Sequence, residues 1–417
     1  MKIIGIDIGT TSVCGVRLDA KTGNVEKSRT ENSNAFIKEC EPFEKIQSVD
    51  KIITIATDIL EDLYEEETAA IGVTGQMHGI VYTDAEGNAV SPLYTWQDER
   101  GNIKYKDSTY AEFVGSPSGY GAVTDFYNRE KGIRPENAVS YCTIQDYFVM
   151  RLCSLKTPVI HKTDFSSFGK RVECNAATVT DGYILAGKYK EIPVAVAIGD
   201  NQASVFSTLD QESVLVNVGT GSQVSVIAHE PIEAENVETR PYFDGKYLIV
   251  GAALCGGRAY SVLKKFYERV LSYTPVFAET DVYGIMEKML LNAKDSLKVD
   301  TRFAGTRGDK SVTGSVMGIN ESNFTPEALT AGVLKGMTEE LWNMYNSMGV
   351  SKAGLVGSGN GIRKNPYLVK ITEEMFGFKM KIPCHAEEAA VGAAMYAGVA
   401  SGIFKDSTEA QCIIKYK

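Results

Sequence analysis

Two segments with the same pattern lie about half the chain apart. They are Ile3–Asp19 (IIGIDIGTTSVCGVRLD) and Ser213–Ala228 (SVLVNVGTGSQVSVIA). In each, β-branched residues precede a Gly-Thr turn and a second β-branched run follows it, which predicts a β-hairpin with a tight turn. One such hairpin is common in buried sheets, but two at this spacing predict two related domains. A chain of 417 residues is also too long for a single ordinary core.

The stretches between and after the hairpins alternate between strand and helix patterns. Apolar periodicity predicts helices over 48–66, 325–348, 366–376 and 387–401. It predicts buried strands over 69–74, 194–198 and 353–356. This alternation predicts α/β layers with mixed sheets. We expect a boundary near Asp200–Thr208, with one domain over 1–203 and the other over 204–417.

Charge and composition exclude several classes of partner. The net charge is −10 and no dense run of Lys or Arg occurs, which argues against nucleic acid or an anionic membrane as a partner. The first ten residues predict a strand rather than a signal peptide, and the longest small-apolar stretch, Ala389–Gly402, is too short for a bilayer span. The eight cysteines are scattered without metal-ligand spacing, so we expect free thiols and a cytoplasmic location.

Three glycine turns could hold phosphate. The first is Gly9-Thr10-Thr11, the second is Gly219-Thr220-Gly221, and the third contains Gly359-Asn360. Turns of this kind offer several N–H groups to phosphate oxygens, and the carboxylate of Asp7 before the first turn could hold Mg²⁺ through water. Taken singly, each turn is more often structural and Asp7 could simply start an Asx-turn; together they are what a nucleotide site requires.

Asp200 follows a predicted buried strand and precedes Asn201 and Gln202. An Asp at such a position is usually a solvent-facing cap. It could instead act as a general base that accepts the proton of an attacking hydroxyl, with the neighbouring amides bonding other hydroxyls.

Two further loops combine polar and apolar side chains at predicted strand ends. They are Gln76-Met77-His78 and Trp96-Gln97-Asp98. Sugars are recognised by such mixtures, because the apolar side chains cover C–H surface and the polar ones bond hydroxyls. The alternatives are a core role for Trp96 and a loop role for His78.

Taken in order, these motifs resemble a known family. The stretches IGIDIGTTSV, GQMHG, YTWQDER, IGDNQAS, NVGTGSQ and VGSGNGIRKNP resemble the FGGY carbohydrate kinases of the actin/Hsp70/sugar-kinase superfamily, from Ile3 to about Gly402. The resemblance is nearest to sedoheptulokinase-like members, then to xylulokinases and glycerol kinases. It implies two ribonuclease-H-like (actin-like ATPase) domains with a nucleotide and sugar cleft between them. It also implies ATP and Mg²⁺ as cofactors, and phosphorylation of a ketose or polyol, with sedoheptulose favoured.

The resemblance also implies roles for individual residues. Asp200 would be the catalytic base and Asp7 the metal-site residue. The implied nucleotide-binding residues are Asp7, Gly9, Thr10, Thr11, Gly219, Thr220, Gly221, Gly359, Asn360 and Asn365. The implied sugar-binding residues are Gln76, Met77, His78, Trp96, Asp98, Asp200 and Asn201.

Two departures from the family pattern leave open a different substrate or a weaker activity. Cys14 stands where the family usually has a basic residue aimed at the phosphates, and strand alternation places Arg17 on the opposite face. The stretch from Ser167 to Glu191 is shorter than in relatives. Xylulokinase-like or glycerol-kinase-like activity and a catalytically weakened nucleotide-binding relative therefore remain alternatives.

Two other classes of protein share the turns. A nucleotide-gated filament or chaperone-like module would not need Asp200 beside two amides. An ATPase that activates another enzyme through an iron–sulfur cluster would need grouped cysteines. We therefore expect a small-molecule sugar or polyol as the partner, and the sequence leaves a homodimer open.

Overall fold

The computed structural model describes residues 1–38, 40–172, 176–274, 281–306, 309 and 311–417. The chain forms two compact units. Unit 1 comprises Met1–Thr208, Pro241–Gly245 and His385–Lys415, and unit 2 comprises Leu209–Arg240, Lys246–Cys384 and Tyr416–Lys417. The division expected at 203/204 differs from these units, because His385–Lys415 returns from the second half of the chain to pack in unit 1.

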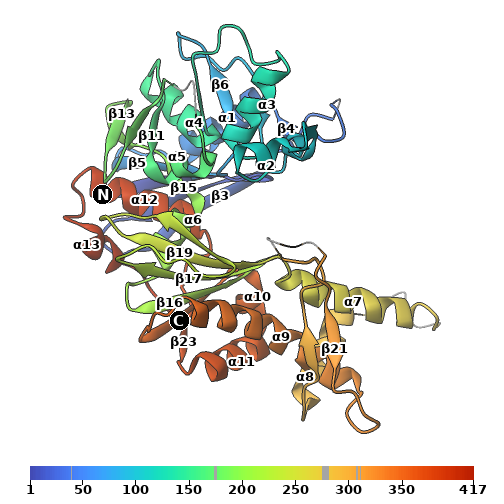
Figure 1. The fold of residues 1–417 in the computed structure, drawn as a ribbon. Coiled ribbons are helices and arrows are strands. Elements are labelled where there is room, and N and C mark those ends of the chain that lie inside the picture. Colours follow the sequence, from blue (N-terminus) through green and yellow to red (C-terminus); the bar gives the residue numbers. More distant parts are fainter. Residues whose placement is uncertain (39, 173–175, 275–280, 307–308, 310) are drawn as a thin grey trace. The chain divides into compact units, whose positions relative to one another are not determined.

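Unit 1 is built on a seven-stranded mixed sheet in the order β13-β14-β5-β1-β2-β3, with β15 also paired to β5 (Figure 1). The predicted first hairpin is confirmed: β1 and β2 pair antiparallel, with Asp7 opposite Cys14, and β5 runs parallel to β1. The strands of this unit are β1 (Lys2–Ile8), β2 (Ser12–Asp19), β3 (Val25–Asn32), β4 (Ile46–Gln47), β5 (Thr68–Gly75), β6 (Val81–Thr83), β7 (Leu93–Tyr94), β8 (Lys104–Tyr105), β9 (Ser108–Thr109), β10 (Ser140–Cys142), β11 (Val159–His161), β12 (Thr178–Thr180), β13 (Leu185–Tyr189), β14 (Ile192–Ala195) and β15 (Ile198–Gly199).

Helices cover both faces of this sheet. They are α1 (Val49–Leu63), α2 (Tyr110–Val114), α3 (Gly121–Glu130), α4 (Ile144–Cys153), α5 (Lys162–Phe165), α6 (Asp200–Thr208), α12 (Glu388–Ala400) and α13 (Ser407–Gln411), with 3-10 turns at Arg100–Asn102 and Ser166–Phe168. Helix α12 is apolar on nearly all sides and is buried against β1, β5 and α6. Gly5 in β1 permits this packing, because a Cβ there would lie 1.8 Å from the carbonyl oxygen of Ala390.

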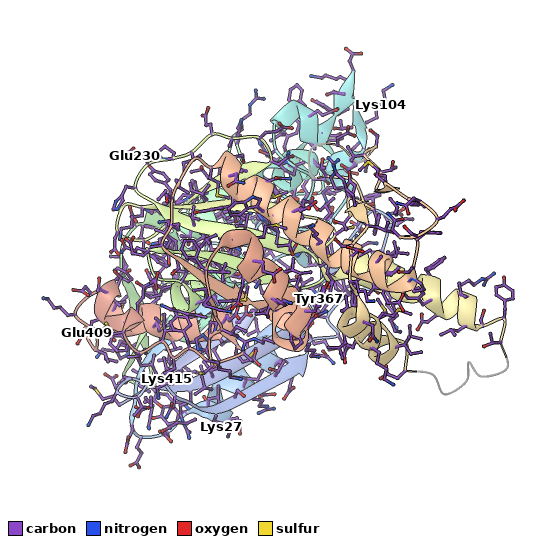
Figure 2. All side chains as sticks on the ribbon, turned by 90° about the horizontal axis from the view of Figure 1, so that it is seen from below. Lys27, Lys104, Glu230, Tyr367, Glu409 and Lys415 are labelled. Atoms are coloured by element: carbon purple, nitrogen blue, oxygen red, sulfur yellow. The ribbon has the colours of Figure 1, made fainter. Side chains whose placement is uncertain are left out.

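Strand β3 forms one edge of the unit 1 sheet. Exposed and half-buried residues alternate along it, and the half-buried Lys27, labelled in Figure 2, is one of its charged residues. The ammonium of Lys27 pairs with Asp62 on α1 at 2.9 Å. Charges along an edge strand oppose pairing with another chain.

Unit 2 repeats the hairpin-led pattern in a six-stranded sheet of order β18-β19-β17-β16-β22-β23. The second predicted hairpin is confirmed, since β16 and β17 pair antiparallel and β22 runs parallel to β16. The strands are β16 (Ser213–Val218), β17 (Ser222–Ala228), β18 (Val237–Pro241), β19 (Tyr247–Ala253), β20 (Lys298–Asp300), β21 (Ser315–Met317), β22 (Gly354–Ser358) and β23 (Met380–Lys381). The helices are α7 (Gly257–Leu271), α8 (Val282–Asn292), α9 (Pro326–Ser347), α10 (Gly359–Lys364) and α11 (Pro366–Phe376).

The long predicted helix of unit 2 is α9, which begins where the sequence predicts. Thr325 caps it, its side chain accepting from the N–H of Ala328, and Pro326 occupies its first turn. Leu334, Met337 and Leu341 lie in the core that α9 shares with the sheet and with α7, α8 and α11.

Two predicted elements differ from the structure. The strand expected over 194–198 is two strands, β14 and β15, because the N–H of Val196 leaves the β5 ladder and donates to Ile184. The glycine turn expected at 357–361 is the end of β22 followed directly by α10, because the positive φ of Gly359 turns the chain from strand to helix. Within the described residues, no helix is long and apolar enough to span a bilayer.

Candidate functional site

Three carboxylates converge in unit 1 at the end of β1. Burial, together with the negative charges of Asp200 and Glu387, raises the pKa of Asp7 to about 7. These residues come from β1, the start of α6 and the N-cap of α12. Bound cations relieve such repulsion, and hard carboxylate oxygens suit Mg²⁺.

The described cysteines are free thiols. Among the residues that the structure describes, no group of three or more His, Cys, Asp or Glu side chains is arranged to hold a metal ion. A Mg²⁺ ion at Asp7 would keep most of its water ligands.

The segment that carries Asp200 is held from two sides. The N–H of Gly199 donates to Thr163 Oγ1 at 3.1 Å, and Thr74 Oγ1 donates to the carbonyl of Ile198 at 2.6 Å. Asp200 then opens α6, so its half-buried carboxylate lies at the positive end of a helix dipole. The two hydrogen bonds fix the position of this carboxylate.

A ring of hydrogen bonds joins the first glycine turn to the predicted sugar loops. The indole Nε1 of Trp96 donates to Thr10 Oγ1 at 2.9 Å, and Thr10 Oγ1 donates to Gln76 Oε1 at 3.4 Å. Gln76 Nε2 donates to Gln47 Oε1 at 3.0 Å, and Gln47 Nε2 donates to the carbonyl of Thr10 at 2.6 Å. No motif marks Gln47 in the sequence, and only the pairing of β4 with β7 brings it here.

His78 is fixed by backbone and ring contacts. Its φ is 74°, its N–H donates to Ser167 Oγ at 3.0 Å, and its Nδ1–H donates to the carbonyl of Ser167 at 2.8 Å. Its ring stacks on Tyr120 with centroids 4.1 Å apart. Ser167 opens the shortened 167–191 stretch, of which 173–175 lie outside the described residues, so this stretch supports the predicted sugar loop directly.

Met77 packs beside Gly199, which precedes Asp200, and Asn201 follows Asp200 in α6. Met77 is buried, and a Cβ built on Gly199 would be 2.8 Å from its Cε. Asn201 is half-buried in the first turn of α6. Gln202, which the sequence suggested as a hydroxyl contact, is instead buried, and its Nε2 donates to the carbonyl of Pro241 at 3.0 Å.

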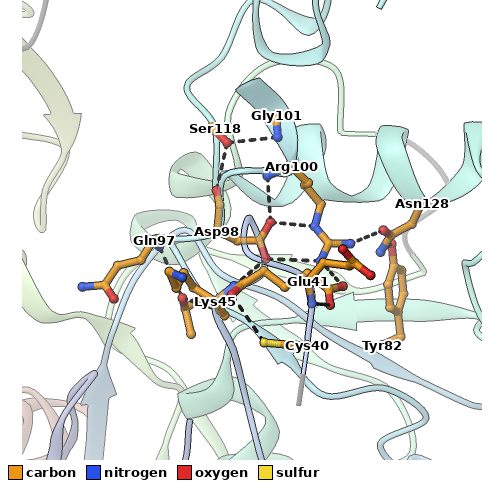
Figure 3. A network of polar contacts seen from close by, with 12 residues as sticks. Cys40, Glu41, Lys45, Tyr82, Gln97, Asp98, Arg100, Gly101, Ser118 and Asn128 are labelled. Atoms are coloured by element: carbon orange, nitrogen blue, oxygen red, sulfur yellow. Dashed lines mark hydrogen bonds and ion pairs between the residues drawn. The ribbon is translucent and has the colours of Figure 1, made fainter. Parts of the chain in front are cut away.

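Asp98 is placed differently from the other predicted sugar residues (Figure 3). It is 1% exposed, and its Oδ1 accepts from Arg100 Nε at 2.7 Å. Its Oδ2 accepts from Arg100 Nη2 at 3.2 Å and from the N–H of Lys45 at 3.0 Å. Ser118 ties the same loop by donating to the carbonyl of Asp98. Because both carboxylate oxygens are engaged, this geometry favours support of the Trp96 loop over direct contact with a ligand.

Two buried carboxyls, Asp146 and Asp164, lie next to Gln145, which is hydrogen-bonded to the end of β5. Gln145 Nε2 donates to the carbonyl of Gly75 at 3.2 Å and to Asp164 Oδ1 at 3.1 Å. Asp146 accepts from both the N–H and the hydroxyl of Thr143, its helix cap. Burial raises the pKa values of both Asp146 and Asp164, and neither residue was singled out by the sequence.

The structure shows what replaces the expected basic residue near the first turn. Cys14 is buried, its thiol donates to Glu387 Oε2 at 3.3 Å, and burial raises its pKa to about 12. Arg17 pairs with Glu65 at 2.9 Å, beyond the end of α1. Neither side chain offers a free positive charge at the turn.

In unit 2, three chain segments meet around the end of β16. The N–H of Gly257 donates to the carbonyl of Gly219 at 2.8 Å, and that of Arg258 donates to Thr220 at 3.0 Å. Gly359 has φ 81°, and a Cβ there would lie 2.5 Å from the carbonyl oxygen of Val218. The start of α7 is therefore hydrogen-bonded to the Gly219–Gly221 turn, and the start of α10 packs against Val218, the residue before it.

A cavity of about 730 Å³ opens beside this turn. Its lining includes the predicted residues Gly219, Thr220, Asn360 and Asn365, and also Arg258, Tyr260, Lys265, Tyr283 and Lys364, which the sequence did not single out. Asn365 caps α11, its side chain accepting from the N–H of Leu368 at 3.0 Å. The size of the cavity is typical of sites for small molecules and cofactors.

Repeated hairpin-led α/β units, with glycine turns beside a cavity, define the chain as a phosphotransferase with the actin-like ATPase fold. The model of the FGGY carbohydrate kinase N-terminal domain matches residues 2–107, and that of the C-terminal domain matches residues 214–401. The chain belongs to the FGGY family of carbohydrate kinases.

Relatives named as sugar or polyol kinases match nearly the whole length of the chain. Mouse sedoheptulokinase (Mus musculus) is 28% identical, covering 94% of this chain and 96% of its own. The glycerol kinase of Aquifex aeolicus is 24% identical, covering 98% of this chain and 91% of its own.

Solved structures share the fold. A xylulose kinase from Lactobacillus acidophilus superposes with a TM-score of 0.84 at 16% identity, covering all of this chain and 92% of its own. The glycerol kinase of Plasmodium falciparum, determined with ADP, gives a TM-score of 0.79 at 17% identity, covering 99% of this chain and 92% of its own. The protein is therefore a carbohydrate kinase that acts on small-molecule sugars.

Proposed function

We propose that this kinase transfers the γ-phosphoryl group of ATP to a hydroxyl of a ketose or polyol, with sedoheptulose favoured and Asp200 as general base. The observation that carries the proposal is the placement of Asp200, held at the N-terminus of α6 by Thr163 and Thr74 and close to Asp7. A carboxylate fixed in this way can take a proton without reorganising. Similarity to sedoheptulokinases supports the choice of sugar.

In this reaction the acceptor hydroxyl loses its proton to Asp200 as its oxygen forms a bond to the γ-phosphorus. The bond between that phosphorus and the β–γ bridging oxygen breaks, and ADP leaves. Asp7 would hold Mg²⁺ through water, and the metal supplies charge neutralisation on the phosphates. The phosphate contacts assigned are Gly9, Thr10, Thr11, Gly219, Thr220 and Gly221, and the adenosine contacts are Gly359, Asn360 and Asn365.

We assign recognition of the acceptor sugar to side chains in and around the hydrogen-bonded ring that contains Thr10. Trp96, 46% exposed, offers an indole face to the C–H surface of a sugar, while Gln76, His78 and Asn201 offer polar atoms. The side chain of Met77 lies at the base of this surface, beside Gly199. Asp98 supports this surface through Arg100 and the backbone of its own loop.

The test is a screen of ketoses and polyols with ATP, read as ADP release, on the wild type and on Asp200→Asn. The matched control is Asp107→Asn, which makes the same charge change at an exposed residue. Asp200→Asn should lower kcat by roughly 10²–10⁴ while leaving ATP affinity nearly unchanged. Retained turnover would show that another group takes the proton. ATP binding by a wild type that turns over no sugar would favour the weakened-relative alternative, and preference for xylulose or glycerol would reassign the substrate.

A further inference from the structure

The guanidinium of Arg258 is a positive charge that the fold does not use. Arg258 is exposed in the first turn of α7, lines the cavity of unit 2, and makes no side-chain hydrogen bond or ion pair to any described residue. A cation at a helix N-terminus opposes the helix dipole, which favours acidic residues there. Stability of α7 therefore does not explain its position.

The backbone of Arg258 is hydrogen-bonded to the Gly219–Gly221 turn. Its N–H donates to the carbonyl of Thr220 at 3.0 Å, and the preceding Gly257 donates to Gly219 at 2.8 Å. The side chain therefore starts directly beside the Gly219–Gly221 turn. In Figure 1, α7 runs outward from this end of the unit 2 sheet, so its later residues lie progressively farther from the turn.

The other cations of the cavity begin farther away. Lys265 lies on the same face of α7 as Arg258 but two turns later, about 10 Å along the helix axis. Lys364 lies at the far end of α10, whose first residue, Gly359, packs against Val218. Arg258 is therefore the cavity cation whose backbone touches the turn.

The first hairpin lacks a comparable charge. Cys14 donates its thiol to Glu387, and Arg17 is paired with Glu65. The carboxylates of Asp200 and Glu387 lie near Asp7 in the same region of unit 1. A nucleoside triphosphate carries several negative charges, and guanidinium binds phosphate oxygens in a two-pronged geometry that ammonium cannot reproduce.

We propose that Arg258 binds the β- and γ-phosphates of the nucleotide and supplies the positive charge that the first hairpin lacks. This inference rests on the proposed function, because it places the polyphosphate at the Gly219–Gly221 turn. It makes Arg258 a phosphate-binding residue of the unit 2 cavity. The nucleoside then occupies the part of the cavity lined by Tyr260, Asn360 and Asn365.

The test compares calorimetric affinities for ATP, ADP and AMP in the wild type, Arg258→Ala and Arg258→Lys. Arg269→Ala is the matched control, since Arg269 is exposed on the same helix and does not line the cavity. Arg258→Ala should weaken ATP and ADP roughly tenfold to hundredfold and leave AMP within about twofold, because AMP lacks the distal phosphates. Arg258→Lys should fall in between, and inorganic tripolyphosphate should displace ATP only when Arg258 is present.

Circular dichroism and the thermal midpoint establish whether each variant folds. If Arg258→Ala does not fold, the affinities of Arg258→Lys test the proposal instead. Equal weakening of ATP and AMP, or unchanged ATP affinity in Arg258→Ala, would overturn it. ATP binding that depends on Arg258 without turnover of any sugar would overturn the proposed kinase reaction alone. Absence of nucleotide binding by the wild type would overturn both.

Discussion

Replacing Asp98 with Asn separates two explanations of this residue, direct contact with the sugar and support of the loop that presents Trp96. The guanidinium of Arg100 is fully buried and contacts both oxygens of Asp98. Its other partners are Asn128 Oδ1 at 2.5 Å, Glu44 at 3.2 Å and the ring of Tyr94 at 4.3 Å. The substitution leaves a buried cation with only a partly exposed carboxylate to balance it.

The size of the effect follows from that environment. Breaking a buried ion pair by removing one partner costs about 3–5 kcal/mol, because the remaining charge stays buried without compensation. Glu44, at 21% side-chain exposure, retains part of the attraction, so we expect a loss of about 3 kcal/mol in the free energy of unfolding of unit 1. For a domain of this size, that loss lowers Tm by roughly 6–12 °C.

The two tryptophans provide an assay for each unit. Trp96 lies in unit 1, two residues before Asp98, and Trp342 lies in α9 of unit 2. In a Trp342→Phe background, the fluorescence of Trp96 follows urea unfolding of unit 1 alone. Asp107→Asn is the control for the charge change.

A double variant, Asp98→Asn with Arg100→Gln, removes the uncompensated charge and should recover part of the lost stability. The reasoning fails if Asp98→Asn keeps its urea midpoint while the KM for the sugar rises tenfold or more. That outcome would place Asp98 in direct contact with the acceptor.

Two further predictions concern other parts of the fold. Gly359→Ala should lower the stability of unit 2 by about 1–2 kcal/mol and weaken ATP binding, since its positive φ and the carbonyl of Val218 exclude a Cβ; unchanged affinity and midpoint would contradict this. Because burial raises the pKa of the Asp146 carboxyl, the folded state holds its proton more tightly than the unfolded chain. The stabilisation from this proton is fully present below about pH 4 and is lost as pH rises through the raised pKa. As pH rises, the denaturant midpoint of the wild type should therefore fall more steeply than the midpoint of Asp146→Asn. Parallel pH profiles of the two proteins would exclude this role for Asp146.

Local patterns were sufficient to predict the elements that lead each unit. The β-branched runs on either side of Gly-Thr turns predicted both hairpins, and Thr325 with Pro326 predicted the start of α9. These features depend on residues close together in the chain, whose side-chain periodicity and backbone preferences are visible in the sequence. For the same reason, Asp7, Asp200 and the three glycine turns could be selected as candidates from their positions at strand ends.

Contacts between residues far apart in the chain could not be predicted from these local patterns. Gln47 reaches Thr10 only because β4 pairs with β7, and Arg258 reaches Thr220 only because α7 starts against the second turn. Asp98 looked like a ligand contact beside Trp96, yet the buried guanidinium of Arg100 draws its carboxylate inward. The sequence alone determined which residue types stand at the strand ends and turns. The tertiary structure decided which of them lie together, because burial, charge pairing and hydrogen-bond partners depend on segments that meet only when the chain folds.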